Sequence, residues 1–198
     1  AGFVDAIGFI ETGGLFVSFM SGNSTQAGVE MLSGNGRVAL LSAYLIVAFV
    51  AGVTLAGMLA GRARDHRPYV VAGAAIALLV VAVLDLTGAG SAWSYGLVSA
   101  VMGAINTLYL AEGRARIAIT YATGTLVSLG LALAALVTGG SRVAWRRPLV
   151  LWGALALGAT AGAAAHRAGT ALSLVAAAGI LSALAVVLLA HRPGRAAA

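Results

Sequence analysis

A cluster of small polar residues interrupts an apolar stretch of the sequence, in "FVSFMSGNSTQAG" at residues 16–28. Hydroxyl and amide side chains beside glycine suit the binding of a small polar or anionic solute, through side-chain hydrogen bonds and approachable backbone amides. A second cluster, "ATGT" at residues 122–125, has the same hydroxyl-and-glycine character. We predict that the two clusters line one substrate site, made of Ser21, Gly22, Asn23, Thr25, Thr123, Gly124 and Thr125.

The elements around these clusters are those of a multi-pass membrane protein. The chain is 61% hydrophobic and 9% charged and has no cysteine, which excludes disulfide and thiolate chemistry. A helix needs roughly 20 residues to cross a bilayer. Apolar runs near that length occur at about 38–61, 69–86, 93–111, 117–137, 149–165 and 171–190. We predict a single all-α transmembrane bundle over residues 1–198, with the lipid bilayer as its partner.

The basic charge has a membrane explanation. The net charge of +6 comes entirely from arginine, and the arginines lie in short connections between apolar runs. This distribution is typical of the positive-inside rule, so we expect no nucleic acid partner. Only about ten residues lead up to Glu11, too few for a span, so the first helix is expected to have lost its beginning.

An internal repeat divides the chain into two homologous halves, at about 1–87 and 88–192. The repeat pairs Asp5 with Asn106 and Gly22 with Gly124. Three blocks align at an offset of 101 or 102 residues: 2–11 with 103–112, 18–28 with 120–130, and "GMLAG" at 57–61 with "GATAG" at 158–162. Each half therefore reads as helix, polar-centred segment, helix, helix.

The polar-centred segments, residues 15–32 and 117–137, either cross the membrane or enter it and return. If all eight segments cross, the 12 arginines divide equally; if both polar segments re-enter, only Arg37 and Arg167 lie outside. The positive-inside bias favours re-entry, which gives six spans, cytoplasmic termini and an inverted 3+3 repeat. Since residues 117–137 are long enough to cross, a broken but crossing helix is the alternative. We expect the break at Gly22 and Gly124, because glycine permits unusual dihedrals.

Asp5 lies among apolar residues in "GFVDAIGF", where burial of a carboxylate is costly and usually serves a purpose. We predict that Asp5, with its repeat partner Asn106, supports the substrate site or couples proton movement to transport. A structural hydrogen bond to a neighbouring helix or to the polar segment is the equal alternative. The pairs Gly57/Gly61 and Gly158/Gly162 predict close helix packing, within the chain or in a homodimer.

The motifs Gly2-x-x-Asp5-Ala6 and Phe19-Met20-Ser21-Gly22-Asn23 carry a resemblance over nearly the whole chain. The sequence resembles the YoaK-like family of bacterial multi-pass membrane proteins, defined as a domain of unknown function. Ser21 and Ser24 stand where threonine is expected at least as often, and the hydroxyls remain. The resemblance implies an integral protein of the bacterial plasma membrane and no particular activity.

Three functions are open to such a chain. The leading hypothesis is a small secondary transporter or channel-like carrier for a small polar or anionic solute, with inverted halves that rock about a midplane site. The alternative is a membrane scaffold or accessory subunit whose polar residues only join helices. An intramembrane enzyme is the weakest, because no HExxH, GxSxG, phosphate-binding or metal-spaced motif occurs. We therefore expect no catalytic residues, metal or cofactor.

Overall fold

The computed structural model describes residues 1–63, 65–111, 114–115 and 122–191, and this part of the chain is almost entirely helical, as predicted. Two-residue strands β1 (Leu110–Ala111) and β2 (Arg114–Ala115) pair antiparallel. The helices are α1 (Gly2–Glu11), α2 (Met20–Leu32), α3 (Gly36–Arg62), α4 (Arg67–Leu86), the 3-10 turn η1 (Ala92–Ser94), α5 (Tyr95–Ile105), α6 (Ala122–Val137), α7 (Arg146–His166) and α8 (Thr170–Ala190).

Four of these helices are long and apolar enough to cross a membrane, namely α3, α4, α7 and α8. They match four of the predicted apolar runs. The runs at 93–111 and 117–137 contain the shorter apolar helices η1–α5 and α6, and residues 116–121 of the second run lie outside the described part. The number and composition of the helices identify a helical membrane protein.

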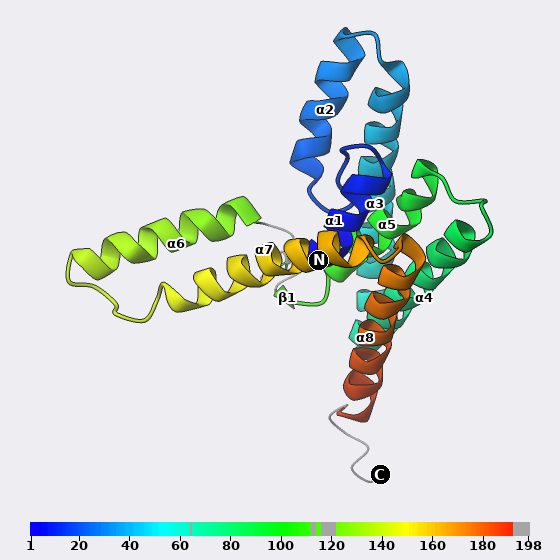
Figure 1. The fold of residues 1–198 in the computed structure, drawn as a ribbon. Helices are drawn as coiled ribbons and strands as arrows, with labels where there is room; N and C mark the ends of the chain where they lie inside the picture. The colour runs from blue at the N-terminus through cyan, green and yellow to red at the C-terminus, as the bar shows by residue number, and fades with distance from the viewer. Residues whose placement is uncertain (64, 112–113, 116–121, 192–198) are drawn as a thin grey trace.

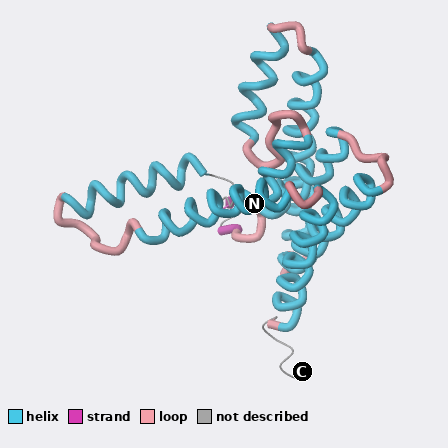
Figure 2. The backbone as a smooth tube through the Cα atoms, in the orientation of Figure 1, coloured by secondary structure: helices cyan, strands magenta, loops and turns pink. Residues whose placement is uncertain are grey.

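Three helix pairs build the packed centre: α3 with α5, α1 with α7, and α4 with α8. Its core is formed by buried aliphatic side chains, among them Ile7, Leu15, Leu45, Leu78, Val98 and Leu174. Two helical hairpins, α2–α3 and α6–α7, extend from this centre in different directions (Figure 1). Turns and loops lie at the hairpin tips, in the centre, in the connection between α4 and η1, and at the end of α8 (Figure 2). The outward faces of both hairpins carry exposed apolar side chains, which suit contact with lipid.

Glycine permits the closest approach between helices at two of these contacts. A β-carbon on Gly52 of α3 would overlap the carbonyl oxygen of Ala100 in α5, and one on Gly162 of α7 would overlap the carbonyl oxygen of Phe3 in α1. The packing predicted for the Gly158/Gly162 pair is therefore present within the chain. No group of the described residues lies near the β positions of Gly57 and Gly61 of α3, so this part of the chain leaves that seam open.

Candidate functional site

A non-helical stretch, residues 12–19, separates α1 from α2. The chain turns at Gly13 and Gly14, whose φ angles are 75° and 111°, a region that glycine adopts at low cost. The Thr12 hydroxyl lies 2.7 Å from the Gly8 carbonyl oxygen and 2.8 Å from that of Leu15, and it accepts the Leu15 N–H at 3.1 Å. Thr12 thus fixes the end of α1 and the start of the stretch.

This geometry corrects the predicted position of the break. We expected the chain to leave helical geometry at Gly22, but Gly22 lies in the first turn of α2, and Gly124 likewise lies within α6. The departure comes earlier because Gly13 and Gly14 take positive φ angles, which end α1. Gly22 instead leaves room for two rings, since a β-carbon there would stand 2.9 Å from Phe19 and 3.0 Å from Phe16.

Asp5 holds the non-helical stretch from the side of α1. Its Oδ1 accepts the backbone N–H groups of Val17 at 2.9 Å and Ser18 at 2.8 Å. The backbone N–H groups of this non-helical stretch have no helical carbonyl partners, and one carboxylate oxygen satisfies two of them. This arrangement matches the structural alternative stated for Asp5, a hydrogen bond to the polar segment.

Asn23 holds the same stretch from the side of α2. Its Oδ1 accepts the Phe16 N–H at 2.8 Å, and its Nδ2 donates to the Phe16 carbonyl oxygen at 2.6 Å. The Asn23 side chain is fully buried. Both halves of the amide are therefore committed to the backbone of a single residue, seven positions earlier in the chain.

The hydroxyls of the first cluster face outward from α2. Ser21, Ser24 and Thr25 are exposed. The Ser24 hydroxyl donates to the Met20 carbonyl at 2.9 Å, and that of Thr25 donates to the Ser21 carbonyl at 3.2 Å. Each hydroxyl keeps its lone pairs available to a further partner. Ser21, Ser24 and Thr25 therefore form a polar surface beside the non-helical stretch.

The second cluster begins α6. Thr123 is exposed, and Gly124 and Thr125 are half-buried in the first turn of α6. Asn106 ends α5, and its Nδ2 donates to the Met102 carbonyl at 2.9 Å. In Figure 1, α2 and α6 both begin near the centre of the molecule and run outward from it. Each packs mainly on its own hairpin partner, α2 on α3 and α6 on α7, so a common site for the two clusters stays a prediction.

Glu11 makes a long-range contact that sequence reasoning missed. Its Oε1 lies 2.6 Å from His166 Nε2 and accepts the Thr170 hydroxyl at 2.7 Å, so the end of α1 is joined to the α7–α8 turn. Partial burial raises the pKa of Glu11, but the hydrogen bonds from His166 and Thr170 outweigh burial and leave the pKa below its ordinary value. Glu11 therefore remains a carboxylate at neutral pH.

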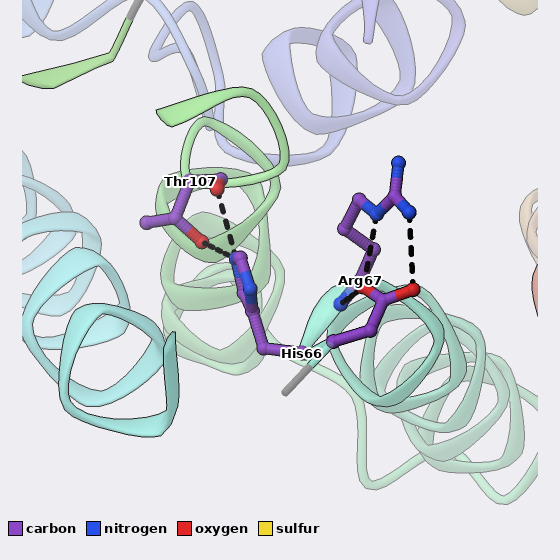
Figure 3. Close-up of polar contacts among 4 residues, drawn as sticks. His66, Arg67 and Thr107 are labelled. Carbon is purple, nitrogen blue, oxygen red and sulfur yellow. Dashed lines mark hydrogen bonds and ion pairs between the residues drawn. The ribbon is translucent and has the colours of Figure 1, made fainter. Parts of the chain in front are cut away.

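His66 makes a related contact in the first half. Its Nε2 lies 2.9 Å from the Thr107 carbonyl oxygen and 3.4 Å from the Thr107 hydroxyl, so the α3–α4 turn is joined to the end of α5 (Figure 3). Beside it, the Arg67 guanidinium pairs with the Asp65 carboxylate at 2.9 Å. No three metal-ligating side chains gather anywhere in the described ranges.

The comparisons with known proteins place the chain in a family. A family model described as "Protein of unknown function (DUF1275)" matches residues 1–187. The chain belongs to the DUF1275 family. The match confirms the resemblance stated from the motifs around Asp5 and Asn23. No curated protein and no solved structure matches the chain. The DUF1275 family has no assigned activity, so membership of the family does not indicate what the protein does.

Proposed function

We propose that the protein is a small secondary transporter or channel-like carrier for a small polar or anionic solute, in the bacterial inner membrane with both termini cytoplasmic. The observation that carries this proposal is the non-helical stretch, residues 12–19, inside an apolar helical bundle. Such backbone at membrane depth is tolerated only where protein buries it or where it lines a water-filled cavity. Here Asp5 and Asn23 satisfy one side of the stretch, and exposed hydroxyls follow it.

The start of α2 favours an anionic or strongly polar solute. The first backbone N–H groups of a helix have no partner within the helix, and the helix dipole gives that end a partial positive charge. The Phe19 carbonyl, at the N-cap of α2, accepts the N–H groups of Gly22 at 3.1 Å and Asn23 at 3.4 Å, and no side chain of Phe19 caps the N–H groups of Met20 and Ser21. The Ser21 hydroxyl adds a donor, and the Thr25 hydroxyl, whose hydrogen bonds the Ser21 carbonyl, adds an acceptor, so the solute we propose binds through both backbone and side-chain groups.

The packing of the helices supports inverted halves. Exchange of the two halves turns the pair α1–α7 into α5–α3 and leaves α4–α8 unchanged. These three pairs make the most extensive helix contacts among the described residues. In Figure 1, α4 and α8 run in opposite directions. Six crossings with two re-entrant segments require opposite directions for α4 and α8, whereas eight crossings require the same direction. The six-crossing arrangement is therefore the one we propose.

The topology is testable because the chain has no native cysteine. Tyr109→Cys and Ser141→Cys lie at exposed positions on either side of the second polar segment. With a re-entrant segment we expect both to react with a membrane-impermeant maleimide from the cytoplasmic face. Reaction from opposite faces would contradict the six-crossing arrangement and with it the inverted repeat.

Transport is tested by solute flux in proteoliposomes. We expect Thr25→Val to lower flux by at least about tenfold, the effect of losing a hydrogen bond worth about 1.4 kcal/mol at the site. Thr54→Val is the matched control, because its hydroxyl also donates to a carbonyl four residues earlier, at 2.9 Å, from an exposed position on α3. The panel contains small anions, amino acids, sugars and organic acids under a pH gradient.

The two variants separate transport from stability. Flux lost in Thr25→Val and kept in Thr54→Val, with equal thermal stability, supports a solute site at the start of α2. Equal flux in both variants would remove Thr25 from that site. Wild-type protein that moves no member of the panel would contradict the carrier.

One observation favours the alternative, a scaffold or accessory subunit that does not transport. The polar groups of Asp5 and Asn23 bind backbone within their own chain, as a purely structural role requires. The open glycine seam at Gly57 and Gly61 suits contact with a second helix, in a homodimer or with a partner protein. A scaffold predicts loss of complex formation in seam variants and no flux in the wild type.

A further inference from the structure

Two histidine contacts occupy related places in the two halves. His166, the last residue of α7 beside the α7–α8 turn of the second half, binds Glu11 at the end of the first helix of the first half. His66, in the α3–α4 turn of the first half, binds Thr107 just after α5, the first helix of the second half. Each contact therefore joins a turn of one half to the end of a helix of the other half. We name them the Glu11–His166 tie and the His66–Thr107 tie.

Both ties lie at the ends of helix pairs that otherwise meet through small residues. The α1–α7 pair approaches closely at Gly2 and Gly162, and the α3–α5 pair at Gly52 and Gly103. Close backbone contact at glycines suits rigid-body movement of one helix against the other, and in the α3–α5 pair the buried hydrogen bond from the Ser99 hydroxyl to the Leu45 carbonyl adds a further fixed point. The polar ties fix the ends of these pairs by directional hydrogen bonds, at 2.6 Å for Glu11 and 2.9 Å for Thr107.

Each tie also borders a polar segment. Glu11 is followed at once by the non-helical stretch that leads to the hydroxyls of α2, and Thr107 follows α5 in the connection that leads to α6. A shift of the end of α1 would move the stretch that Asp5 and Asn23 hold. In the six-crossing arrangement the α7–α8 turn lies at the outer face and the α3–α4 turn at the cytoplasmic face.

We propose that the Glu11–His166 tie is the outer gate of the carrier and that the His66–Thr107 tie is its inner gate. The inference rests on the proposed function and deepens it by naming the contacts that close each face. Release of one tie frees its helix pair to open that face, while the other tie keeps the opposite face closed. Alternating access needs two such states, and the two ties bias the equilibrium between them in opposite directions.

The test measures access to the polar surface of α2 from each side of the membrane, and it needs no solute. Ser24→Cys is an exposed reporter, and an impermeant maleimide labels it in right-side-out or inside-out vesicles. His166→Phe keeps a ring and removes the tie; we expect labelling from the outer face to rise about fivefold and labelling from the inner face to fall. His66→Phe should produce the reverse pattern.

His191→Phe is the matched control, because His191 caps α8 with Nδ1 2.9 Å from the Val187 carbonyl of that helix and joins no other helix within the described residues. Its labelling should equal that of the wild type from both faces. Should His166→Phe fold poorly, Glu11→Leu removes both hydrogen bonds of the same tie, to His166 and to Thr170, and serves in its place. Unchanged labelling in both tie variants, or labelling raised from both faces, would contradict the proposal that the two ties are gates. If no solute of the panel were transported, only the proposed carrier function would be contradicted, because the labelling experiment measures access without a solute.

Discussion

Replacing Asn23 with leucine is expected to lower the free energy of unfolding by about 2–6 kcal/mol, because it leaves two backbone groups of Phe16 without partners. Leucine has the same branching as asparagine but bulkier methyl groups, so no cavity forms, and the lost hydrogen bonds and some overpacking both lower stability. The side chain is fully buried, and water cannot replace the amide without opening the loop. Equilibrium unfolding in mixed micelles, followed by circular dichroism, measures the change.

Two further variants fix the interpretation of that result. Asn23→Asp keeps an acceptor for the Phe16 N–H but loses the donor to the Phe16 carbonyl, so we expect a smaller loss of stability than in Asn23→Leu. Ser24→Ala, on the exposed face of the same helix, should change stability by no more than about 0.5 kcal/mol. If Asn23→Leu were as stable as wild type yet lost solute flux, Asn23 would act on the solute and not on Phe16.

The long helices were predictable from the sequence because burial in lipid requires continuous apolar runs. The runs at 38–61, 69–86, 149–165 and 171–190 correspond to α3, α4, α7 and α8 within a few residues. The apolar run at 93–111 is longer than the helix within it, which ends at Ile105. Side chains of Asn106 and Thr107 hydrogen-bond the carbonyls of Met102 and Ala104, and such local bonds compete with helix continuation.

The polar residues of the candidate site could be predicted from the sequence, but the backbone groups that they bind could not. Asp5 and Asn23 stood out because polar residues in apolar segments are costly. Their common target, the stretch Phe16 to Ser18, could not be inferred, because it depends on where Gly13 and Gly14 turn the chain. The tie between Glu11 and His166 spans 155 positions, and no local pattern indicates a contact at that separation.

The contact between α3 and α5 predicts a second large effect. Gly52→Ala is expected to lower the free energy of unfolding by about 3 kcal/mol, because the added methyl would overlap the Ala100 carbonyl and the helices would have to separate. Separation would also stretch the hydrogen bond from the Ser99 hydroxyl to the Leu45 carbonyl, which is 2.8 Å long and buried. The loss should exceed the gain in helix propensity from alanine, about 0.8–1.0 kcal/mol.

Gly57→Ala is the matched variant, five residues along the same helix at a position with no group near the β-carbon. In an isolated chain it should gain about 0.8–1.0 kcal/mol from helix propensity alone. Unfolding of both variants in the same micelles gives the comparison. A loss in Gly57→Ala as large as that in Gly52→Ala would mean that another helix covers the Gly57/Gly61 seam. Since the described helices leave that seam open, the covering segment would come from a second chain, as the scaffold alternative requires, or from residues outside the described ranges.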